Sequence, residues 1–148
     1  MPSFQQHRRE IRRRPRLRNR SLRRGVAAVE FAIVAPIFFM LVVGIIEVGR
    51  AMMVQQVLIN ASRVGARQAV TLSSTQTSVV NAVTSYAQGV GVPGVSVTVS
   101  PDPATASAGQ SITVNARINY ASVSWLPAPW FMGGKQLQAS SVMRKEGF

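Results

Sequence analysis

The longest apolar stretch of the chain lies near its amino-terminal end and has a glutamate close to each limit. Sixteen uncharged residues, 31–46, lie between Glu30 and Glu47. Residues 26–29 and Val48 extend the stretch to about 23 residues, or about 35 Å as an α-helix, which is enough to cross a hydrocarbon core of about 30 Å. The alternative, a buried helix of a soluble domain, is disfavoured because the last 99 of the 148 residues are too polar to surround it. The pattern predicts a transmembrane helix.

The helical pattern continues beyond this stretch, with no strong breaker before Ser73 and Ser74. We therefore expect one helix over about residues 26–72. Two lines of small residues at four-residue spacing follow it: Ala28 and Ala32 in the membrane half, and Ala61, Gly65 and Ala69 in the outer half. Small side chains let another element approach closely. We expect the first line to pack against a partner helix and the second to hold the chain's own sheet.

The carboxyl-terminal half changes to short elements. Ser78 is a candidate cap for a short helix over residues 79–88, with Val79, Val83, Tyr86 and Ala87 on one side. Two runs, 95–100 and 112–120, then alternate apolar and polar residues, which predicts an antiparallel pair of half-buried strands with Asp102 as a turn residue between them. A third strand is expected over residues 136–143. The fold class is therefore α+β: a long amino-terminal transmembrane helix, a short helix and a small antiparallel sheet.

An apolar segment broken by two prolines, residues 121–132, precedes the third strand. Its large side chains are Trp125, Trp130 and Phe131. They either cover the sheet as part of the core or form a contact patch for a partner or for the outer leaflet, where tryptophan is favoured. The pattern alone leaves both interpretations open.

Charge is distributed unevenly along the chain. The net charge is +12, and ten arginines against Glu10 give residues 1–24 a net charge of +9. Positive residues beside a membrane helix stay cytoplasmic, so we expect the amino terminus inside and the carboxyl-terminal domain outside, with the tail attracting anionic membrane lipid. Nucleic acid is an unlikely partner, because no aromatic residues alternate with the arginines for base stacking. Beyond the apolar stretch, Arg50 either pairs with Glu47 on one helix face or is solvated separately.

The residues that enzymes and metal sites need are scarce. The chain has no cysteine, and its one histidine, His7, lies in the basic tail. Only Glu47, Asp102 and Glu146 follow Glu30 as carboxylates. This composition argues against a catalytic triad, a paired-carboxylate active site, a metal site or a bound cofactor. We therefore expect no enzyme activity.

Two glutamates lie in the predicted membrane helix: Glu47 is at its outer end, whereas Glu30 lies towards its amino-terminal side. An ionisable group inside a membrane segment usually has a partner. Glu30 could reach the headgroups or pair with the preceding arginines.

Glu30 also stands five residues after Gly25 and directly before Phe31. This Gly-x4-Glu-Phe pattern, after a basic leader and before an apolar helix, resembles the prepilin-peptidase recognition site of type IV pilins and pseudopilins. Residues 24–70 resemble the TadE-like family of tight-adherence (Flp) pilus assembly proteins, and residues 140–146 are similar to the way such proteins often end. Residues 71–137 match only in general character.

The resemblance implies a pilin-like plan and a structural role. The leader would be cut after Gly25, so that Val26 becomes the mature amino terminus and Glu30 neutralises the terminal amine of a neighbouring subunit. The implied partners are a prepilin peptidase, other pilins or pseudopilins and pilus assembly proteins. The implied function is that of a minor pseudopilin, a single-pass protein of the cytoplasmic (inner) membrane.

Three segments are expected on this basis: a basic cytoplasmic leader over 1–25, a transmembrane helix with an extracytoplasmic extension over 26–72, and a small extracytoplasmic domain over 73–148. The alternative is an unprocessed single-pass membrane-anchored binding module. Its arginine-rich tail would attract lipid or nucleic acid, and residues 125–131 would form its contact patch.

Overall fold

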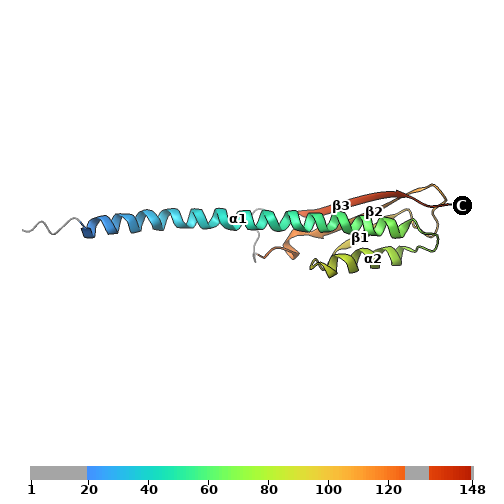
Figure 1. Ribbon diagram of the computed structural model, residues 1–148, viewed down its shortest axis with the longest axis horizontal. Helices are drawn as coiled ribbons and strands as arrows, with labels where there is room; N and C mark the ends of the chain where they lie inside the picture. Colours follow the sequence, from blue (N-terminus) through green and yellow to red (C-terminus); the bar gives the residue numbers. More distant parts are fainter. Residues whose placement is uncertain (1–19, 126–133, 148) are drawn as a thin grey trace, which may run out of the picture. The chain divides into compact units, whose positions relative to one another are not determined.

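The computed structural model describes residues 20–125 and 134–147, with the side chains of 20–24 left aside. The chain divides by packing into two units, Met1–Val42 and Val43–Phe148. Helix α1, Arg20–Ala69, contributes to both units (Figure 1). The three segments expected from the sequence stay a prediction, because they concern the membrane and a cleavage site rather than packing.

Helix α1 differs from the predicted helix at both ends. It begins at Arg20, six residues earlier than expected, within the basic segment that precedes the apolar stretch. Arginine and leucine are good helix formers, so the helical pattern extends backwards from the apolar stretch. The helix ends at Ala69, where Thr71 donates its backbone N–H to the Gln68 carbonyl and the chain turns before Ser74.

Helix α2, Gln76–Gly89, is longer than predicted, and its cap is Thr75 rather than Ser78. The Thr75 hydroxyl accepts the Ser78 backbone N–H at 3.2 Å, and the Ser78 hydroxyl accepts the Thr75 backbone N–H at 3.0 Å. Ser78 takes the position that a glutamate or glutamine usually occupies in a capping box. Val79, Val83 and Ala87 form the buried face of the helix, as the pattern predicted, and Tyr86, the fourth residue of that face, is half-buried.

The three predicted strands are present and form an antiparallel sheet in the order β1-β2-β3. They are β1 (Ser96–Ser100), β2 (Ser111–Asn119) and β3 (Gln136–Arg144), and a short 3-10 helix, η1 (Tyr120–Ser122), follows β2 directly. Ala116 on the central strand lies opposite Val97 on β1 and Ala139 on β3. Asp102 caps the turn after β1 by accepting the Ala104 backbone N–H at 2.9 Å.

The core of the second unit lies between one face of the sheet and the two helices. Helix α1 contributes Val54, Leu58 and Ala61, α2 contributes Val79 and Val83, and β2 contributes Ile112, Val114, Ala116 and Ile118. Figure 1 shows α2 alongside β1 and the second half of α1 alongside the strands. The predicted α+β fold, with its long apolar helix, second helix and small antiparallel sheet, is confirmed.

Candidate functional site: the apolar helix and a buried carboxylate

The first part of helix α1 presents its apolar side chains to the surroundings. Among the described helices, α1 alone is long and apolar enough to cross a membrane, and none of its most apolar 18-residue window is buried. Phe31, for example, is 70% exposed. An apolar surface of this extent on all sides of a helix is typical of a segment that faces lipid or other helices.

The residues of the predicted cleavage and register motif all lie on this exposed part of the helix. Gly25, Val26, Glu30 and Phe31 are exposed, and a Cβ built on Gly25 meets no atom within 4 Å. Ala28 and Ala32, the first line of small residues, are exposed as well. This arrangement leaves the motif and the small-residue line open to a partner.

The second line of small residues lies inside the folded unit. Ala61, Gly65 and Ala69 are buried. A Cβ built on Gly65 would collide with Val83 Cγ2 and would lie 3.0 Å from Val114 Cγ1. Glycine at this position therefore allows α1 to approach α2 and β2 closely.

A buried carboxylate follows the apolar stretch. Glu47 is only 8% exposed, so it is not the solvated charge that one sequence interpretation allowed. Its Oε2 atom accepts hydrogen bonds from the Tyr120 hydroxyl at 2.6 Å and from the Ser124 hydroxyl at 2.8 Å. The Tyr120 hydroxyl also lies 2.8 Å from the Glu47 carbonyl oxygen. These bonds join helix α1 to the segment that follows β2.

The electrostatics of this cluster favour a neutral tyrosine. Burial, followed by the hydrogen bond to Glu47 and the negative charge of Glu47, raises the pKa of Tyr120 to about 12, while the Arg50 charge acts in the opposite direction. A phenol held neutral in this way remains a hydrogen-bond donor to the carboxylate.

The sequence interpretation placed Tyr120 at the end of a half-buried strand and missed its bond to Glu47. In the structure Tyr120 is buried, but it lies in η1 directly after β2. Two signals pointed to the bond. A buried tyrosine usually finds a partner for its hydroxyl, and Glu47 is one of the few carboxylates in the chain.

Arg50 lies beside the same cluster and contacts Trp125. Its Nε donates to the Val123 carbonyl oxygen at 3.2 Å, and its guanidinium carbon lies 5.4 Å from the centre of the Trp125 ring. Trp125 is 71% exposed, so it does not cover the sheet as the core interpretation predicted. Trp130 and Phe131, the other members of the predicted patch, lie outside the described residues.

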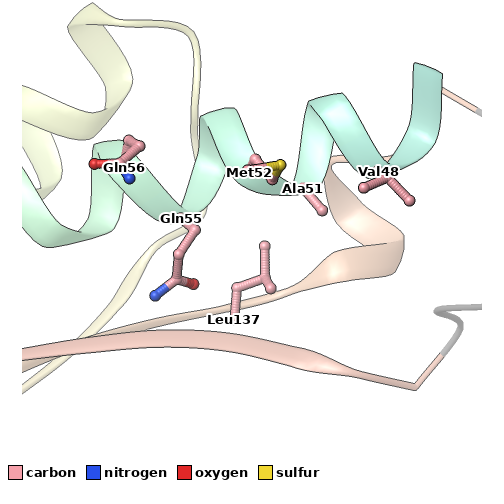
Figure 2. A pocket seen from close by; sticks show the side chains of 6 residues that line it. All are labelled: Val48, Ala51, Met52, Gln55, Gln56 and Leu137. Carbon is pink, nitrogen blue, oxygen red and sulfur yellow. The ribbon is translucent and has the colours of Figure 1, made fainter. Parts of the chain in front are cut away.

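A shallow groove of about 340 Å³ lies between helix α1 and strand β3 (Figure 2). Its lining residues are Val48, Ala51, Met52, Gln55, Gln56 and Leu137. Figure 2 shows Gln55 extending from α1 towards β3, where its Nε2 donates to the Gln138 carbonyl oxygen at 2.9 Å. None of these lining side chains is titratable, so the groove offers no general acid or base.

The described residues, 20–125 and 134–147, also contain no group of three His, Asp or Glu side chains that could hold a metal ion. The notable features of the described chain are therefore the exposed apolar helix, its Gly25–Glu30 motif and the buried cluster around Glu47.

A comparison with known protein families finds a match for part of the chain. The family model described as TadE-like protein matches residues 25–67, which are 43 of the 148 residues. The matched segment begins at Gly25 and includes both Glu30 and Glu47. No curated protein and no solved structure gives a significant match. The resemblance expected from the Gly25, Glu30 and Phe31 motif is thus confirmed: residues 25–67 of this chain are similar to the TadE-like family.

Proposed function

We propose that this protein is a minor pseudopilin of a tight-adherence type IV-like pilus, anchored in the cytoplasmic membrane by helix α1. The observation that carries the proposal is the TadE-like segment with Gly25 and Glu30 at its start, followed by an apolar helix that is exposed on all sides. A prepilin peptidase cuts after Gly25 on the cytoplasmic side. Other pilins and pilus assembly proteins then pack against the exposed helix.

The basic leader sets the orientation of the helix. Ten arginines precede Gly25, and positive residues near a membrane helix stay on the cytoplasmic side. The carboxyl-terminal domain is then extracytoplasmic. The leader itself falls largely in residues 1–19, outside the described residues.

Glu30 sets the register of a subunit in the filament. After cleavage, Val26 carries a terminal ammonium and Glu30 lies four residues further on. A carboxylate and an ammonium are each costly to bury alone, whereas a pair of them offsets much of that cost. Glu30 of one subunit therefore pairs with the terminal amine of its neighbour, while Ala28 and Ala32 let the two helices approach.

This role predicts that Glu30→Gln abolishes incorporation into surface filaments without removing the protein from the membrane. The substitution keeps the size of the side chain but removes the charge that the neighbouring amine needs. The measurement compares the amount of protein in sheared filaments with the amount in membranes, in cells that contain the cognate assembly proteins. Glu146→Gln is the control, because it removes an exposed carboxylate from the far end of the chain. Incorporation of Glu30→Gln at the wild-type level would refute the register role.

A second candidate is an unprocessed membrane-anchored binding module. The exposure of Trp125 beside Arg50 favours it, because an exposed aromatic residue with a nearby cation is typical of a contact surface. This candidate retains the arginine-rich leader, which attracts lipid or, less readily, nucleic acid. The two candidates therefore differ in the amino terminus of the mature protein.

A further inference from the structure

We propose that Arg50 and Trp125 form a membrane-contacting surface that lies among the phospholipid headgroups of the leaflet next to the folded domain. The proposal rests on the membrane anchoring proposed above but not on cleavage or filament assembly. It assigns a partner, the lipid surface, to a half-buried arginine and an exposed tryptophan that the pseudopilin role leaves unused.

The position of Arg50 along helix α1 supports this surface. Val43, Ile46, Arg50 and Met53 follow one another at spacings of three, four and three residues, so they share one face of the helix. Ile46 is 48% exposed and Met53 is 49% exposed. Arg50 therefore lies within a line of exposed apolar side chains, about 6 Å beyond Ile46 along the helix axis. A cation at the end of an apolar stretch is where a lipid phosphate would be met.

The contacts of Arg50 hold it in this place. Its Nε donates to the Val123 carbonyl oxygen, and its Nη1 lies 3.8 Å from Met53 Sδ. The guanidinium lies over the Trp125 ring. The helix and the segment after β2 thus present a cation and an indole side by side, and the Glu47–Tyr120 bonds fix these two elements to each other.

The chemistry of the pair fits the headgroup layer. Tryptophan is enriched at membrane–water interfaces because its ring is apolar and its N–H is polar. Arginine binds phosphate oxygens through its planar set of donors. Residues 43–148 carry seven Lys and Arg against three Asp and Glu, a net charge of +4, which favours an anionic lipid surface. The solvent-facing indole and the exposed Ile46 and Met53 would all lose contact with water there.

Tryptophan fluorescence of the full chain in lipid vesicles tests the surface. The chain has two tryptophans, so a Trp130→Phe variant makes Trp125 the sole emitter. The protein is reconstituted into vesicles of phosphatidylcholine and phosphatidylglycerol that contain a nitroxide lipid labelled either at the headgroup or at the chain end. The control adds Leu72→Trp to Trp125→Phe and Trp130→Phe. Leu72 is 66% exposed and follows α1, 22 residues beyond Arg50, or about 33 Å if spaced as in a helix.

The surface predicts strong quenching of Trp125 by the headgroup nitroxide, weaker quenching by the chain-end nitroxide, and protection from acrylamide in water. The Leu72→Trp emitter should show the opposite behaviour, with free access for acrylamide and no quenching by either lipid. Equal acrylamide access for the two emitters would overturn the proposal. So would a Trp125 that is shielded from acrylamide but untouched by both nitroxide lipids, since that result indicates contact with protein.

A carbonate wash of the same vesicles distinguishes a failure of the membrane anchoring from a failure of the Arg50–Trp125 surface. Protein released by carbonate contradicts the anchoring and this surface together. Retained protein with a water-accessible Trp125 contradicts the surface alone.

Arg50 has its own test in the same vesicles. The headgroup quenching of Trp125 should increase when phosphatidylglycerol replaces part of the phosphatidylcholine. That increase should be lost in Arg50→Gln and kept in Arg50→Lys, because lysine retains the charge. An increase that persists in Arg50→Gln would show that Arg50 does not meet the anionic lipid.

Discussion

Glu47 is a carboxylate that the fold has taken out of water and surrounded with hydroxyl donors. Tyr120 and Ser124 both donate to its Oε2 atom. An isolated carboxylate would be costly to bury, and hydrogen bonds to its charged form offset that cost. Glu47 belongs to α1 and directly follows its apolar stretch. Its bonds therefore connect α1 to the segment that follows β2.

We predict that Tyr120→Phe lowers the free energy of unfolding by an amount that depends on pH. At neutral pH the variant should unfold about 1–3 kcal/mol more easily, because the carboxylate loses a buried donor. The folded pKa of Tyr120 is raised from 10.0 to about 12, so the wild-type advantage is complete below pH 10 and is lost as the pH rises towards 12. Two pKa units correspond to about 2.7 kcal/mol, which is enough to bring the two proteins close together.

Denaturant unfolding of the full chain in mild detergent, at a series of pH values, measures this difference. Tyr86→Phe is the control for loss of a hydroxyl, since Tyr86 lies on α2 and not on either element of the Glu47–Tyr120 contact. A difference between wild type and Tyr120→Phe that stays constant up to pH 12 would contradict the assignment.

Single residues were the hardest feature to predict from the sequence. The alternation over residues 112–120 correctly predicted that Tyr120 is buried, although it lies in η1 directly after β2. A partner 73 positions away in the chain leaves no local pattern. The exposure of Trp125 was also not predictable, because an apolar segment broken by prolines has the same sequence pattern whether its side chains are buried or exposed. Glu30 and Gly25 were recognisable because their spacing is local.

At the scale of elements, helix α1 carries two different surfaces in succession. Its first part is exposed and apolar, while its second part buries one face against α2 and the sheet. Gly65 marks the closest approach, because a side chain there would enter the space of Val83 and Val114. The helix therefore serves both as the apolar segment and as one layer of the folded domain.

Gly65→Ala tests this close approach. Overpacking a well-packed core costs about 1–3 kcal/mol. Gly49→Ala is the matched control in the same helix, since a Cβ at Gly49 meets no atom within 4 Å. Both variants share the gain in helix propensity, so Gly65→Ala should be less stable than Gly49→Ala by about 1–3 kcal/mol in chemical denaturation. Equal stability of the two variants would show that α1 is not held at this distance.

The elements themselves were largely predictable. Strict alternation located β1 and β2 to within a residue, and the helical period identified the buried face of α2. The predicted cap of α2 was wrong because Thr75 and Ser78 are both good capping residues. Only the reciprocal bonds between them identify Thr75 as the cap. The predicted start of α1 was wrong because the basic segment lacks apolar periodicity, although the arginines and the leucine of residues 20–24 are good helix formers.

At the scale of the whole molecule, the chain combines a basic leader, an apolar helix and a small α+β domain in which carboxylates are few. Ten of its seventeen Lys and Arg residues precede Gly25. The removal of this leader would change the net charge from +12 to about +3, because the arginines leave together with Glu10. Cleavage would thus turn a strongly basic membrane protein into a nearly neutral subunit that can pack against its neighbours.

The mature amino terminus is the measurement that tests this pathway most directly. The protein is isolated from native membranes that contain the cognate prepilin peptidase, and its intact mass and amino-terminal sequence are determined. We predict a start at Val26, and we expect Gly25→Val to retain the whole leader while Gly49→Val is cut normally. A wild-type protein that still begins at Met1 or Pro2, with its arginines in place, would contradict the pseudopilin function and favour the unprocessed membrane-anchored module.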